Sequence, residues 1–180
     1  MRDSRPTEDR DENAARRFFA GLTEQAFMTE LGVADPPLVD YVSGLLVRFL
    51  RSDDIYSVRS VRGERLTQVA DMLAEAMARR GQAKRQLLRH VGDFTLFWTG
   101  LYPEIADRIR KAGMKDMLID YREQGKHSYA TASKIPVERE SAPSDVLERL
   151  ADEFELCAYG LGEVRKAWEE SGGGEPTLLL

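Results

Sequence analysis

The sequence feature that most constrains the fold is an apolar stripe that repeats at alternating steps of three and four residues. The stripe consists of Leu147, Leu150, Phe154, Cys157, Leu161, Val164 and Trp168. This spacing keeps one face of a helix apolar, so it predicts a long helix over 144–171 that begins at a Ser144 cap. Small residues flank the stripe at Ala151, Ala158, Gly160 and Ala167. We therefore expect packing within the same domain in preference to a homodimeric coiled-coil seam.

Helical spacings recur along most of the remaining chain. They predict helices over 13–31, 37–51, 64–80, 82–101, 105–113 and 114–134. Residues 52–63 are ambiguous, because Ser52 or Asp53 could cap a short helical turn, whereas the segment could also form an extended loop or a small hairpin. The sequence thus predicts an all-α fold, a single compact bundle of about six or seven helices with short loops.

The domain boundaries follow from composition. A chain of 180 residues with 42% hydrophobic content fits one domain that buries its own core. Residues 1–12 have no apolar side chain after Met1, so we expect a disordered tail there. Three consecutive glycines precede EPTLLL, which predicts a flexible tail over 172–180. The all-α domain is therefore assigned to 13–171.

Charge and cysteine content limit the setting of the protein. The net charge of -5 argues against general nucleic-acid binding, although it leaves room for a local basic patch. A single cysteine cannot form an intramolecular disulfide, and no signal-peptide pattern is present, so we expect a cytoplasmic location. The longest apolar stretches, 41–50 and 94–102, fall short of the roughly 18 residues that cross a bilayer, so no membrane span is expected.

The most aromatic run, VGDFTLFWTGLYPE, encloses Asp93 and two glycines, Gly92 and Gly100. On a helix, Arg89, His90 and Asp93 share one face, which becomes apolar one turn later. One hypothesis makes His90 and Asp93 an acid/base pair or a pair of metal ligands, and a related one places them in an aromatic pocket that binds a small ligand. The candidate polar cluster is Arg89, His90, Asp93, Trp98 and Tyr121, and a pocket would also require Tyr41 and Tyr129 to converge on it.

A structural explanation of the same run is preferred. It pairs Asp93 with Arg89 and packs the ring of His90 on Phe94. Gly92 and Gly100 each cost roughly 1 kcal/mol relative to alanine inside a helix, so something must offset them. The simplest candidate is the close approach of a neighbouring helix.

A basic run, RRGQAKRQLLRH, supplies a second candidate site. Arg79, Arg80, Lys84 and Arg85 could contact phosphates, another anionic ligand or nucleic acid. Gly81 interrupts the run and helix geometry spreads its charges, so a solvated face is the preferred interpretation.

Other chemistry-bearing residues have structural explanations. His127 falls on a polar helix face, and Cys157 lies on the apolar stripe, where a thiol usually only packs. No HExxH, ExxH or paired-cysteine pattern is present, so no metal or cofactor is expected. We therefore expect a non-enzymatic interaction or regulatory domain whose partner is another protein or a second copy. The alternatives are a ligand-binding or enzymatic bundle at His90 and Asp93, and anion binding through 79–90.

Three segments, LRHVGDFTLFWTGLYPE, IDYREQGKHSYATAS and LERLADEFELCAYGLGEVRKAW, resemble uncharacterised all-helical bacterial proteins. The resemblance spans residues 37–168. It implies a single fold unit and a bacterial origin, and it implies no particular activity, cofactor or catalytic residue.

Overall fold

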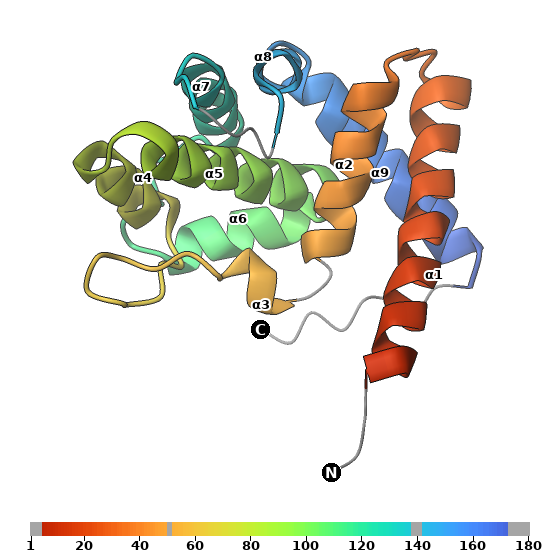
Figure 1. The fold of residues 1–180 in the computed structure, drawn as a ribbon, viewed down its shortest axis with the longest axis horizontal. Coiled ribbons are helices and arrows are strands. Elements are labelled where there is room, and N and C mark those ends of the chain that lie inside the picture. The colour runs from red at the N-terminus through yellow and green to blue at the C-terminus, as the bar shows by residue number, and fades with distance from the viewer. Residues whose placement is uncertain (1–4, 50–51, 138–141, 173–180) are drawn as a thin grey trace.

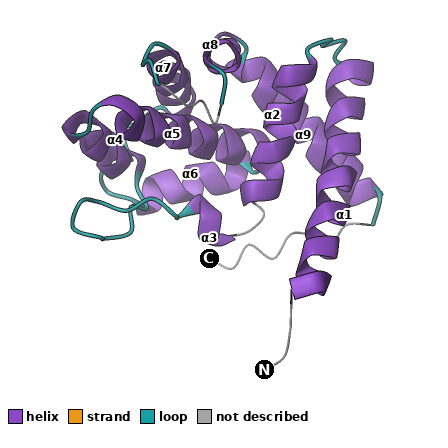
Figure 2. Ribbon diagram, in the orientation of Figure 1, coloured by secondary structure: helices purple, strands orange, loops and turns teal. Residues whose placement is uncertain are grey.

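A computed structural model describes residues 5–49, 52–137 and 142–172 of the chain (Figure 1). Within these residues the chain forms helices joined by loops, as Figure 2 shows, and the predicted all-α fold is confirmed. The elements in chain order are α1 (Arg5–Glu24), the π-helical turn η1 (Gln25–Glu30), α2 (Pro36–Phe49), α3 (Ser52–Ile55), α4 (Val69–Ala78), α5 (Gly81–Leu101), α6 (Pro103–Ala112), α7 (Tyr121–Ser133), α8 (Ser144–Asp152) and α9 (Phe154–Glu170). None of these helices has both the length and the apolar character that crossing a membrane requires.

Helix α5 is the centre of the fold. It packs against α2, α4, α6, α7 and α9, and it crosses the middle of the molecule in Figure 1. Every residue from 91 to 101 is buried. A helix segment that is covered on all sides must be apolar or internally satisfied around its whole circumference, which explains why the aromatic run occurs here.

Two glycines allow neighbouring helices to approach α5 closely. A Cβ atom added to Gly92 would lie 2.7 Å from ring atoms of Tyr129 on α7. A Cβ atom added to Gly100 would lie 2.9 Å from Cβ of Leu161 and 3.1 Å from Cα of Ala158, both on α9. These distances leave no room for a side chain at either position. The prediction that both glycines admit a neighbouring helix is therefore confirmed.

The C-terminal apolar stripe packs inside the domain. Its first six residues are all 0% exposed, and the ring centroid of Trp168 lies 5.2 Å from that of Phe19 on α1. The prediction of one continuous helix over 144–171 was wrong, because α8 ends at Asp152 and α9 begins at Phe154. The break lets α8 pack along α7 while α9 packs along α5, which one straight helix could not do.

The first helix begins earlier than predicted. Residues 5–12 belong to α1, whereas the sequence suggested a disordered tail over 1–12. Adding residues to an existing helix gains one hydrogen bond for each residue fixed, so a polar segment can extend a helix that apolar residues already hold in place. The remaining parts of the predicted tails, 1–4 and 173–180, lie outside the described residues.

Two other helices begin later than predicted. Helix α4 begins at Val69 and α7 begins at Tyr121, so residues 64–68 and 114–120 are not helical. Both alternatives for 52–63 occur, since α3 is followed by a small hairpin in which Arg59 pairs with Arg65.

Candidate functional site

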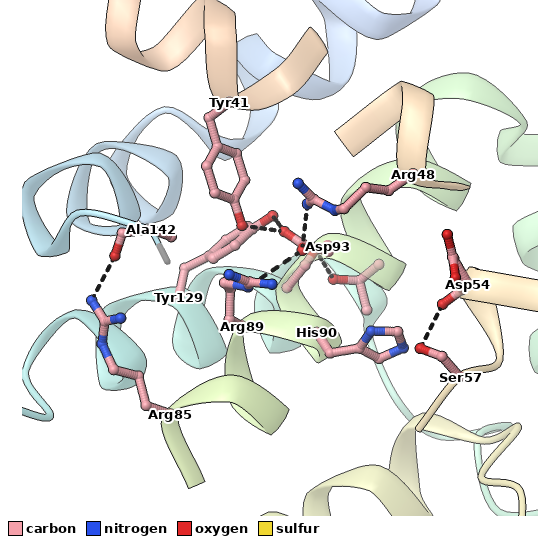
Figure 3. Close-up of polar contacts among 12 residues, drawn as sticks. Tyr41, Arg48, Asp54, Ser57, Arg85, Arg89, His90, Asp93, Tyr129 and Ala142 are labelled. Carbon is pink, nitrogen blue, oxygen red and sulfur yellow. Dashed lines mark hydrogen bonds and ion pairs between the residues drawn. The ribbon is translucent and has the colours of Figure 1, made fainter. Parts of the chain in front are cut away.

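Asp93 is the centre of a buried polar cluster that joins α2, α5 and α7 (Figure 3). Its Oδ1 accepts hydrogen bonds from the hydroxyl groups of Tyr41 at 2.6 Å and Tyr129 at 2.7 Å. Its Oδ2 accepts a hydrogen bond from Nη2 of Arg48 at 3.0 Å and lies 3.8 Å from Nε of Arg89. Only 2% of Asp93 is exposed, so these groups replace the water that a carboxylate would otherwise bind.

The protonation states in the cluster favour a structural role. Burial, together with the adjacent Asp93 carboxylate, raises the pKa of Tyr41 and of Tyr129 well above the ordinary value. Both phenols therefore stay protonated and donate to the carboxylate, while the guanidinium groups compensate its charge. The predicted pairing of Asp93 with Arg89 is present, but the shorter contact is with Arg48, which sequence reasoning missed.

His90 makes different contacts from those expected. Its Nε2 lies 3.1 Å from the carbonyl oxygen of Ile55, and its ring centroid lies 5.6 Å from that of Phe49. The expected packing partner was Phe94, so that prediction was wrong. Burial lowers the pKa of His90, and a neutral ring that donates from Nε2 to the Ile55 carbonyl satisfies the geometry.

The side chains proposed for an aromatic pocket do not converge on one place. Trp98 is 1% exposed and packs against Phe94 and Phe97 in the aromatic core. The hydroxyl of Tyr121 donates to Oδ2 of Asp116 at 2.7 Å. Among the aromatic side chains required for the pocket, those of Tyr41 and Tyr129 contact Asp93, whereas Trp98 and Tyr121 have the other partners just described.

Arg85 is a structural residue, not part of a solvated basic face. It is 3% exposed, and its Nε donates to the carbonyl oxygen of Ala132 at 3.1 Å near the end of α7. Its Nη2 donates to the carbonyl oxygen of Ala142 at 2.9 Å and to the hydroxyl of Ser144 at 3.0 Å (Figure 3 shows the Ala142 contact). The suggestion that Arg85 binds an anion is thus corrected, because its guanidinium joins the end of α7 to the start of α8.

The other members of the basic run have separate environments. Nε of Arg79 donates to Oε1 of Glu75 at 2.9 Å, and its Nη2 donates to the carbonyl oxygen of Arg59 at 2.8 Å. Arg80 is exposed and Lys84 is half-buried on the first turns of α5. The run therefore does not form one continuous basic surface.

A surface pocket of about 410 Å³ lies between α5, the end of α4 and the hairpin. Its charged and titratable lining residues are Arg59, Arg79, Arg89 and His90, and its remaining lining residues are Val58, Ala83, Gln86 and Leu87. We call this site the arginine pocket. It combines residues from both sequence-based candidate sites with Arg59, which sequence reasoning missed because only the hairpin brings it there.

A second surface feature is the turn at 113–118 between α6 and α7, which we call the apolar turn. Three of its side chains are exposed to an unusual degree, namely Met114 at 89%, Met117 at 57% and Leu118 at 92%. Asp116 in the same turn is 0% exposed. Its Oδ2 accepts from the amide of Val69 at 2.8 Å and its Oδ1 accepts from the amide of Ala70 at 2.9 Å.

Asp116 therefore caps the first turn of α4 from a distant part of the chain. Gln68, the residue before this helix, makes no side-chain capping hydrogen bond of its own. Orphan amides at the start of a helix need an acceptor, and a carboxylate also interacts favourably with the helix dipole. No local sequence signal could have identified Asp116, because its partners lie 46 and 47 residues away.

Among residues 5–49, 52–137 and 142–172, no group of three or more His, Cys, Asp or Glu side chains is arranged to hold a metal ion. Comparison of the chain with protein-family models, curated proteins and solved structures finds no match.

Proposed function

We propose that this protein is a non-enzymatic interaction domain that binds another protein through the apolar turn. The observation that carries the proposal is the exposure of Met114, Met117 and Leu118 within one short turn. Single exposed apolar residues are ordinary on protein surfaces, whereas a contiguous group marks an interaction site. Burying each side chain against a partner contributes roughly 1.5 to 3 kcal/mol before the costs of association.

The backbone of the apolar turn is held in place before any partner binds. The carboxylate of Asp116 accepts hydrogen bonds from the amides of Val69 and Ala70 and from the hydroxyl of Tyr121, which anchors the turn to α4 and α7. The amide of Lys115 donates to Oε1 of Gln68 at 3.2 Å. A fixed turn loses little conformational freedom on binding, so its exposed side chains can act as anchors.

The charges around the apolar turn favour a protein partner over an anionic lipid surface. Nζ of Lys115 lies 2.6 Å from Oδ1 of Asp71, so the positive charge within the turn is already paired. The chain carries a net charge of -5, which opposes attraction to an anionic membrane. The surface chemistry instead fits an apolar groove on another protein, wide enough to receive one turn.

Site-specific photo-crosslinking tests this proposal. A photoreactive amino acid in place of Leu118 is expected to give one defined adduct with another protein in extracts of the source cells. The same amino acid in place of Val61, which is 81% exposed but lies outside the turn, should give no such adduct. Met114→Ser combined with Met117→Ser should abolish the adduct. Met77→Ser is the matched control, because Met77 is 81% exposed but lies on α4, outside the turn.

Two further outcomes would show that the apolar turn binds something other than a different protein. An adduct of twice the protein's own mass would identify a second copy of the chain as the partner and would contradict the proposal of another protein. Cosedimentation with phosphatidylserine vesicles that is lost in the Met114→Ser, Met117→Ser variant would assign the turn to a lipid surface. Identical adducts from positions 118 and 61 would show that the turn is no binding site.

A further inference from the structure

Three arginines from separate parts of the chain line the arginine pocket. Arg59 comes from the hairpin, Arg79 from the end of α4 and Arg89 from α5. Among the described residues, no aspartate or glutamate lines this pocket. Guanidinium groups in such an arrangement are well suited to an anion that carries several acceptor oxygens.

Two carboxylates outside the lining pair with two of the three arginines. Glu75 pairs with Arg79, and Asp93 is shared between Arg48 and Arg89. Nη1 of Arg59 donates to the carbonyl oxygen of Gly63 at 3.3 Å, a neutral acceptor. Arg59 thus donates to a neutral acceptor, and its positive charge borders the pocket.

The rest of the lining supports an organic ligand. Val58, Ala83 and Leu87 provide apolar surface next to the arginines, and Gln86 adds a neutral polar group. A volume of about 410 Å³ falls within the range of small-molecule sites. A carboxylate ligand would need one guanidinium, whereas three suit the charge and oxygen count of a phosphate.

We infer that the arginine pocket binds a small organic phosphate, with the phosphate group among Arg59, Arg79 and Arg89 and the organic group against Val58 and Ala83. Nucleic acid fits the same residues less well. A nucleic-acid strand requires a basic groove along its backbone, and burial of Arg85 removes one member of the basic run from the surface. The inference is independent of the proposed binding of a protein at the apolar turn.

Isothermal titration calorimetry with phenyl phosphate tests this inference. We expect phenyl phosphate to bind and phenol, which has the same ring without the charge, to give no measurable binding. Arg59→Gln should weaken binding by about tenfold through the loss of charge-assisted hydrogen bonds. Arg62→Gln is the matched control, because Arg62 is exposed on the same hairpin but does not line the pocket, and its effect should stay within about twofold.

Further measurements make the test decisive. Arg59→Lys should bind with intermediate affinity, because lysine keeps the charge but loses the paired donors. Thermal unfolding of all variants checks that they fold alike. The inference is overturned if millimolar phenyl phosphate does not bind the wild-type protein, or if Arg59→Gln and Arg62→Gln weaken binding equally. It is also overturned if a single-stranded oligonucleotide binds more tightly and Arg80→Gln weakens that binding more than Arg59→Gln does.

Discussion

Tyr129 contacts two consecutive residues of α5, because its hydroxyl donates to Asp93 at 2.7 Å while its ring occupies the space beside Gly92. Glycine and a buried acid are each unfavourable inside a helix. Here the missing side chain of Gly92 makes room for the ring, and the carboxylate of Asp93 accepts from the hydroxyl. One side chain of α7 thus fills the space beside Gly92 and supplies one of the contacts that satisfy Asp93.

The first prediction concerns the charge of Asp93. Asp93→Asn should lower the free energy of unfolding by about 2 to 4 kcal/mol, because it removes the negative charge between the guanidinium groups and replaces one acceptor oxygen with an amide donor. Asp40→Asn on α2 is the control, since Asp40 is exposed and its change should stay within about 0.5 kcal/mol. Urea denaturation measures both values, and equal stabilities for the two variants would refute a structural role for Asp93.

The second prediction concerns the space beside Gly92. Gly92→Ala should destabilise the protein by about 1 to 3 kcal/mol, because the new Cβ would lie 2.7 Å from the Tyr129 ring. Gly21→Ala on α1 is the matched control. It has open space around it and should be neutral or stabilising by up to about 1 kcal/mol from helix propensity. Stabilisation by both substitutions, measured by chemical denaturation, would contradict the close approach of α7.

The third prediction concerns acid stability. Burial lowers the pKa of His90, and this effect outweighs the opposing influence of Asp93, while Arg89 and Arg48 act in the same direction as burial. The unfolded chain therefore binds a proton at His90 before the folded protein does. Consequently, the free energy of unfolding should fall as the pH drops below about 6.5 and should level off below the folded pKa.

His90→Gln should reduce this loss of stability between pH 7.5 and pH 5.5, because glutamine does not titrate and can still donate to the Ile55 carbonyl. His127→Gln is the control, since His127 is exposed on α7. Urea denaturation at both pH values provides the measurement. An unchanged pH dependence in the His90→Gln variant would argue against a contribution from this residue.

The fourth prediction concerns Cys157, the only cysteine in the chain. It is 0% exposed, and burial raises the pKa of its thiol to about 12. Labelling with iodoacetamide at pH 8 should be at least about a hundredfold slower in the native protein than in urea, because the thiolate is scarce and covered. Rapid stoichiometric labelling of the native protein would show that the thiol is accessible and reactive.

The sequence predicted the features that depend on local periodicity. The apolar stripe and the burial of the aromatic run follow from spacing along one helix, and the close approach at Gly100 follows from the cost of glycine inside a helix. The division of the stripe between α8 and α9 did not follow, because each half packs along a different neighbour. Helix periodicity indicates which face is buried but not which helix covers it.

Long-range polar contacts could not be predicted in the same way. Asp93 and Tyr129 are 36 residues apart, and Arg85 reaches carbonyl groups 47 and 57 residues away. Charge alone placed Arg85 in a basic patch, since nothing in its neighbours shows which carbonyl groups will surround it. Arg48 offered a partial signal, because it lies seven residues after Tyr41 on a largely apolar helix and thus shares its face.

We propose that the Asp93 cluster is structural and that binding occurs at the apolar turn. Photo-crosslinking from position 118 in two variants tests this proposal most directly. The temperature should be low enough for both variants to be folded. Asp93→Asn should retain the heterologous adduct, while Met114→Ser with Met117→Ser should lose it. Loss of the adduct in folded Asp93→Asn, with retention in the turn variant, would contradict this proposal and would place binding at the Asp93 cluster.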